Sequence, residues 1–157
     1  MVIQRWQSLL LLICAALMAC CAFMNFGYIE TPENTFMLDS MGISYFEGVT
    51  KGLDGASYFM HTWYFFILSI LCIVMPLIDI FLYSNLRLQM RVCMMQIMFI
   101  IADLAVGLVI GYTAVGGGSF SWGSGSLAGI LALFAAGLAL AYMRRDRNRL
   151  RSADRLR

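Results

Sequence analysis

The chain has 157 residues, of which 61% are hydrophobic and 13% are charged, and its formal net charge is +2. Soluble domains contain about 45–50% apolar and about 25% charged residues. A small domain also leaves too much of its surface in water to hide such an excess of apolar side chains. The composition therefore excludes an ordinary water-soluble domain and predicts a single domain surrounded mostly by lipid.

Four apolar segments are long enough to cross a bilayer as helices. They comprise residues 8–26, 61–83, 92–113 and 126–143. About 20 apolar residues, rising about 1.5 Å each, cover roughly 30 Å of hydrocarbon. The sequence therefore predicts an all-α membrane protein, in which one four-helix transmembrane bundle covers residues 1–157 and carries a basic tail at 144–157.

The arginines indicate the orientation of this bundle. All of them lie at Arg5, at Arg87 and Arg91, or within residues 144–157. Basic residues collect in cytoplasmic loops, so both termini and the second connection are predicted to be cytoplasmic. Contact with anionic lipid already accounts for such basic clusters, and we therefore expect the lipid bilayer as a partner and no nucleic acid.

Two segments are predicted to lie outside the membrane. In the first, residues 27–60, two short apolar runs at 35–38 and 43–46 flank Asp39-Ser-Met-Gly42. This pattern is typical of a β-hairpin whose turn ends in glycine. Two strands alone are marginally stable in water, so the hairpin should lie on the outer ends of the helices. The second segment, residues 114–125, is rich in glycine and serine and is expected to be a flexible linker.

The first apolar segment contains Leu17-Met-Ala-Cys20, which faintly resembles a lipoprotein signal whose cysteine is lipidated. Met18 fits poorly where a small residue is needed, and the run stays apolar through Phe26, longer than the core of a signal peptide. We therefore favour a retained helix, with lipidation of Cys20 as the alternative.

All cysteines fall within the predicted helices, at positions 14, 20, 21, 72 and 93. The spacing of a redox C-x-x-C motif is absent from the sequence, and no cysteine has metal-ligand spacing to the single histidine, His61. We interpret the cysteines as small apolar packing residues. The sequence predicts no metal site, no cofactor and no catalytic constellation, and thus no enzyme.

Polar residues inside the apolar segments are the candidate functional positions, because a charge in hydrocarbon is costly. Gln89, Gln96 and Asp103 recur every seven residues and so share one helix face. Asp103 lies about 18 Å along the helix from Arg91, near mid-membrane. Asp79 lies near the inner interface, and we expect it to reach Arg87 or Arg91.

Three interpretations of Asp103 stay open. It is a protonated acid that hydrogen bonds Gln96 or a neighbouring helix, it contacts a partner membrane protein, or it takes part in proton or cation movement. Small residues at steps of four also line the last two predicted helices, at Gly107, Gly111, Gly125, Gly129, Ala128, Ala132 and Ala136. This spacing favours close helix packing, either within one chain or between copies in a homo-oligomer.

Three short stretches resemble one protein family. Met1-Val-Ile-Gln-Arg-Trp-Gln7 is similar to its Met-Ile-Gln-Arg-Ile-Gln start, with an extra Val2 and with Trp6 in place of an aliphatic residue. Asn85-Leu-Arg-Leu-Gln-Met-Arg91 resembles its Leu-Gln-x-Arg connection, and Arg151-Ser-Ala-Asp-Arg-Leu-Arg157 resembles its Arg-Ser-x-Asp-Arg-Leu-Arg terminus. The family comprises uncharacterised four-helix membrane proteins of Bacteroidota that carry a domain of unknown function. The resemblance implies a bacterial inner-membrane location and four helices, and it implies no activity.

These stretches all fall on the predicted cytoplasmic side, where they suggest an interaction face. Its residues are Arg5, Gln7, Arg87, Arg91, Arg151, Asp154 and Arg155. The sequence therefore favours a non-enzymatic membrane subunit or assembly factor that contacts another membrane or cytoplasmic protein. A small transporter or channel component that uses Asp103 is the alternative.

Overall fold

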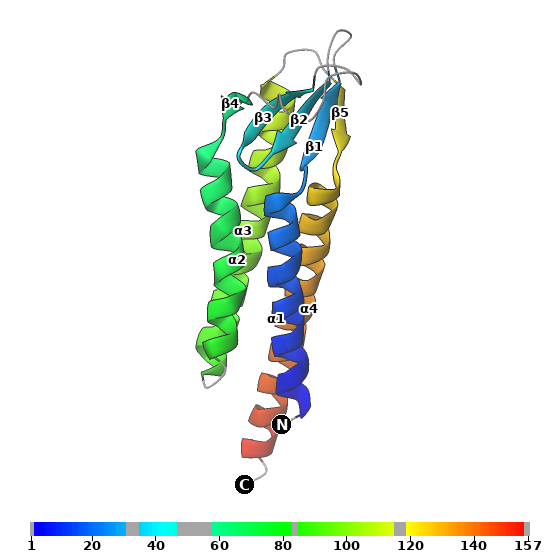
Figure 1. Cartoon of the computed structure of the whole chain (residues 1–157). Coiled ribbons are helices and arrows are strands. Elements are labelled where there is room, and N and C mark those ends of the chain that lie inside the picture. Colours follow the sequence, from blue (N-terminus) through cyan, green and yellow to red (C-terminus); the bar gives the residue numbers. More distant parts are fainter. Residues whose placement is uncertain (1, 31–34, 47–57, 83–84, 115–118, 156–157) are drawn as a thin grey trace.

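The computed structural model describes residues 2–30, 35–46, 58–82, 85–114 and 119–155. Its helices are α1 (Val2–Phe23), α2 (Trp63–Phe81), α3 (Leu86–Thr113) and α4 (Ser124–Arg155). They run alternately up and down, so that both chain ends lie at one end of the bundle, here the termini end (Figure 1). All four helices are long and apolar enough to cross a membrane.

Three helices, α1, α3 and α4, extend beyond the predicted apolar segments at the termini end, whereas α2 is shorter than its predicted segment 61–83. α1 already begins at Val2 and α3 at Leu86, while α4 continues to Arg155. Most of the segment predicted as a basic tail is therefore a helical extension of α4. Arginine, leucine and alanine are good helix formers, so the backbone hydrogen bonds continue where the apolar residues end. Hydropathy marks the part suited to lipid, and it does not mark the end of the helix.

A five-stranded antiparallel sheet lies at the opposite end of the bundle, here the sheet end (Figure 1). Its strands are β1 (Gly27–Glu30), β2 (Thr35–Asp39), β3 (Gly42–Phe46), β4 (Tyr58–His61) and β5 (Ser119–Trp122), in the order β4-β3-β2-β1-β5. β2 and β3 form the predicted hairpin, in which Asp39 pairs with Gly42 and the turn is Ser40-Met41. The hairpin is thus the middle of a wider sheet.

The expectation of a flexible linker over 114–125 is wrong for residues 119–122, which form β5. Gly27 pairs with Trp122 and Ile29 with Phe120, so β5 adds to the free edge of β1. The amide of Gly123 continues this pairing by donating to the carbonyl oxygen of Phe26 at 3.0 Å. A four-residue strand cannot form alone, and its partner strand directly follows α1, far away in the sequence.

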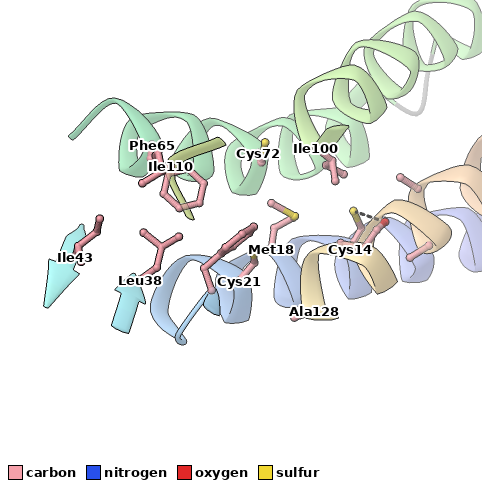
Figure 2. Packing of buried hydrophobic residues seen from close by; sticks show 14 of the residues in the cluster. Cys14, Met18, Cys21, Leu38, Ile43, Phe65, Cys72, Ile100, Ile110 and Ala128 are labelled. Atoms are coloured by element: carbon pink, nitrogen blue, oxygen red, sulfur yellow. Dashed lines mark hydrogen bonds between the residues drawn. The ribbon is translucent and has the colours of Figure 1, made fainter. Parts of the chain in front are cut away.

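The buried face of the sheet packs onto the ends of the helices. Leu38 and Ile43 of the sheet belong to the same core cluster as Phe65 of α2 and Ile110 of α3 (Figure 2). Phe26, just after α1, meets Phe65 edge-to-face, with ring centroids 5.4 Å apart. The sheet therefore ties together the helix ends that it covers.

Small residues let this structure pack closely within one chain. A Cβ atom at Gly111 would lie 2.7 Å from the Phe120 ring, and one at Gly125 would lie 2.9 Å from the backbone oxygen of Met24. Ala132 and Ala136 of α4 are fully buried. The small-residue stripes therefore serve close packing within the chain.

Candidate functional site

A column of buried polar residues runs through the bundle between the two ends. The buried positions of α3 follow steps of four and three, through Gln89, Cys93, Gln96, Ile100, Asp103 and Gly107. Those of α2 do the same, through Phe65, Ser69, Cys72, Pro76 and Asp79. This 3.5-residue period keeps one face of each helix turned toward its neighbours. We define the polar column as Cys14, Cys21, Ser69, Asp79, Gln89, Gln96 and Asp103, each at most 2% exposed.

Asp103 occupies the level of the column nearest the sheet. Its Oδ1 accepts a hydrogen bond from the Ser69 hydroxyl at 2.8 Å, and its Oδ2 accepts one from the Cys21 thiol at 4.0 Å. The carboxyl group thus joins α3 to both α2 and α1. Of the sequence interpretations, the intramolecular tie describes this geometry, although its partners are Ser69 and Cys21 and Gln96 is not among them.

Gln96 occupies the middle level. Its Nε2 donates to the Cys14 sulfur at 2.9 Å, and the Cys14 thiol donates to the Ala132 carbonyl oxygen at 3.4 Å, the dashed line in Figure 2. These contacts join α3, α1 and α4. The Gln96 Oε1 atom is buried and accepts no hydrogen bond from the described residues.

The buried cysteines have a polar role that their sequence pattern did not predict. All five are free thiols, and four of them are buried. Cys14 and Cys21 hydrogen bond to Gln96 and Asp103, whereas they were interpreted as apolar packing residues. A signal was present, because Cys14 and Cys21 are seven residues apart, the same spacing that separates Gln96 from Asp103.

Asp79 occupies the level nearest the termini end, and its environment corrects the expected arginine pairing. Both carboxylate oxygens are buried without a hydrogen-bond partner among the described residues. The Gln89 Nε2 donates to the backbone oxygen of Asp79 at 3.3 Å and not to its carboxyl group. Arg87 and Arg91 are exposed, because neither belongs to the inward-facing series of α3.

The structure exposes only some residues of the predicted interaction face at the termini end. Gln7 is buried and its amide donates to the Asp146 carboxylate of α4, so it holds α1 against α4 and cannot serve as an exposed contact. This corrects its assignment to that face. The reason is its place in the buried series of α1, four residues before Leu11.

The remaining members of that face lie on three helices. Arg87 and Arg91 are exposed on α3. Arg5, Arg151, Asp154 and Arg155 lie within α1 and α4, and their side chains lie outside the described part of the structure. Asp146, which the sequence analysis did not select, is the one acid among the first arginines of that segment and binds Gln7.

Two further features of the described residues concern metal binding and the ionisation of an acid outside the helices. Among the described residues, no group of three or more histidine, cysteine, aspartate or glutamate side chains could hold a metal ion. Outside the helices, Asp39 at the hairpin turn is half-buried, and this burial raises the pKa of its carboxyl group above the ordinary value of 3.8.

Comparison with known proteins confirms the family resemblance. The family model described as a domain of unknown function, DUF4293, matches residues 3–156, which include the sheet, the whole polar column and all of the four helices except Val2. No curated protein matches the chain. The chain therefore belongs to the DUF4293 family, whose domain has no known function.

Proposed function

We propose that this protein spans a bacterial inner membrane with both termini in the cytoplasm and the sheet outside, and that it acts by contact as a membrane subunit or assembly factor. The observation that carries this proposal is the extension of α4 at the termini end. Its last turns reach past the ends of the other helices (Figure 1). We call residues 144–155 the arginine arm, which at about 1.5 Å per residue is about 18 Å long.

The composition of the arginine arm fits an acidic protein surface better than a bilayer surface. The arm contains six arginines and two aspartates, and its apolar residues are only Leu150 and Ala153. A helix that lies in the membrane interface needs a broad apolar face, which this arm lacks. Arg144, Arg145 and Arg149 are exposed, and such guanidinium groups favour carboxylate partners.

The arginine arm is held in place by the bundle. The buried Gln7 amide donates to the Asp146 carboxylate inside the arm. Just before the arm, Ala139 and Met143 are fully buried in a core cluster that includes Leu11 of α1. A docking element that is ordered before binding loses less conformational entropy when a partner arrives. This supports a role in stable contact.

A transporter or channel component is the second candidate, and one observation favours it. Asp79 joins Asp103 inside the bundle, so the interior holds two deep carboxyl groups, as a proton or cation pathway would. Asp103 is engaged by Ser69 and Cys21, which supports a structural role for this acid instead. Proton flux into vesicles should fall to the background of empty vesicles for Asp103→Asn if transport is the function.

The experiment that separates the candidates is native mass spectrometry after gentle solubilisation from native membranes. We expect the wild type to co-purify with a partner that presents an acidic cytoplasmic surface. Replacing Arg149 and Arg151 with glutamine, which removes two charges from the arm, should release the partner. The matched control, Arg87→Gln with Arg91→Gln, removes exposed charge at the same end and should retain it.

The remaining arginines at the termini end, including Arg144 and Arg145, preserve the positive charge that orients the protein. Recovery of the wild type alone, as a monomer or homo-oligomer, would refute the contact role. So would retention of the partner by the arm variant. If both variants lose binding to anionic vesicles equally, the arm binds lipid through charge alone.

A further inference from the structure

Asp79 differs from the other polar residues of the column because neither of its side-chain oxygen atoms has a hydrogen-bond partner among the described residues. Its side chain is fully buried, and neither carboxylate oxygen accepts a hydrogen bond from a described residue. Asp103, equally buried, has two donors. A buried polar group without a partner is costly, so Asp79 points to a ligand that the described residues do not supply.

No basic side chain among the described residues hydrogen bonds the Asp79 carboxylate. One titratable neighbour is the Cys93 thiol of α3, which donates to the backbone oxygen of Ala136 in α4 at 3.7 Å. Of the basic groups at this end, Arg87 and Arg91 of α3 and Arg144 of α4 are exposed. On the facing helices, Asp146 of α4 is bound by Gln7 of α1.

The chemistry of the site selects the smallest possible ligand. A metal cation needs several oxygen, nitrogen or sulfur ligands at short distance, and no such group exists among the described residues. A proton needs only one carboxylate oxygen, and it removes the charge that makes burial in an apolar environment unfavourable. The ligand class that fits Asp79 is therefore the proton.

We propose that Asp79 is a proton-binding site, which holds its proton while the termini end of the bundle is closed and releases it when water enters the polar column. The closure is made by apolar side chains. Ile80 and Met90 pack against the core cluster of Leu11, Cys93, Ala139, Leu140 and Met143. Loosening this cluster would hydrate Asp79 and stabilise its ionised form. Proton binding is thereby coupled to the contact of α2 and α3 with α1 and α4.

This proposal does not rest on the docking role or on transport. Ser69, which binds Asp103, and Asp79 are ten residues apart on α2, which corresponds to about 15 Å along the helix. The two acids are therefore separate sites, and each can be tested alone.

Infrared spectroscopy of the full chain in lipid vesicles tests the proposal directly. A protonated carboxyl group has a C=O stretching band that is absent from the carboxylate, and the band lies at higher frequency when no donor contacts the oxygen. We expect such a high-frequency band at neutral pH in the wild type. Asp79→Asn, which is nearly isosteric, should remove it, whereas Glu30→Gln on the exposed part of β1 should leave it unchanged.

Two results would overturn the proposal. One is a wild-type spectrum in which Asp79→Asn removes only a carboxylate band, because Asp79 would then be ionised and hydrated. The other is a high-frequency band that survives Asp79→Asn. Should Asp79→Asn fail to fold, labelling of the wild type with a hydrophobic carbodiimide replaces it, because this reagent adds to protonated carboxyl groups in membranes. The label should map to the peptide that contains Asp79, and its absence there would equally refute the site.

Discussion

The hydrogen bond between Ser69 and Asp103 gives the sharpest test of the polar column. Its donor and acceptor atoms are 2.8 Å apart, and both residues are fully buried. Hydrogen bonds between membrane helices contribute about 0.6 kcal/mol on average and at most about 1.7. Removing one partner also leaves the other unsatisfied, at a cost of about 1–3 kcal/mol. We therefore expect Ser69→Ala to lower the free energy of unfolding by about 1–2 kcal/mol.

A double-mutant cycle isolates this contact. Ser69→Ala, Asp103→Ala and the double variant are unfolded by sodium dodecyl sulfate in mixed micelles, with helix content followed by circular dichroism. We expect a coupling energy of about 1 kcal/mol. Asp103→Asn keeps an acceptor oxygen for Ser69, so it should be clearly milder than Asp103→Ala.

The control pairs Asp103→Ala with Thr62→Val, which removes a buried hydroxyl that donates to the Ser40 carbonyl oxygen at 3.3 Å near the sheet. These two changes share no partner and should be additive within about 0.5 kcal/mol. If the Ser69 cycle shows no more coupling than this control, the hydrogen bond does not stabilise the bundle and the reasoning fails.

Three further predictions follow from the packing and from one pKa. Gly111→Leu should destabilise the fold by about 1–3 kcal/mol, because a Cβ atom there would lie 2.7 Å from the Phe120 ring. Gly137→Leu should be close to neutral in the same micelle assay, since nothing lies within 4 Å of its Cβ position. Equal effects of the two leucines would contradict this account of close packing. Asp146→Ala removes the acceptor of the buried Gln7 amide and should destabilise the packing of the base of the arginine arm against α1 by about 1–3 kcal/mol. The effect should be visible as faster backbone hydrogen exchange in the last turns of α4. Unchanged exchange would show that the contact does not hold the arm. Burial raises the pKa of Asp39 above its ordinary value of 3.8, so protonation favours the folded sheet. That contribution is fully present below pH 3.8 and is lost as the pH rises through the folded pKa. Asp39→Asn should therefore flatten the acidic part of the pH profile of thermal unfolding and stabilise the protein at neutral pH, and an unaltered profile would refute this.

The sequence predicted the helices because their cause is local. A segment in lipid must satisfy its own backbone hydrogen bonds and must stay apolar for the thickness of the hydrocarbon. Both requirements can be read from consecutive residues. The seven-residue spacing of Gln89, Gln96 and Asp103 likewise predicted one shared face, since that spacing alone decides which side chains of a helix lie together.

The sheet was predicted only in part, and the reason is also physical. The β2–β3 hairpin is local, because its turn joins strands that are neighbours in the sequence. β5 has no such signal: its partner β1 lies at the other end of the chain, and the approach of α1 to α4 brings the two together. A short run such as Ser119-Phe-Ser-Trp122 forms a strand only if the free edge of another strand lies beside it.

By itself, the sequence determined that this is a four-helix, lipid-compatible chain with a hairpin and a polar stripe on α3. The tertiary structure alone decided the partners of that stripe, by the rotation and height at which the helices pack. It set Ser69 and Cys21 beside Asp103, Cys14 beside Gln96, and Gln7 beside Asp146. It also left Asp79 without the arginine that its place in the sequence predicted. Contacts between helices are non-local, and no spacing within one helix encodes which residue of another helix will face it.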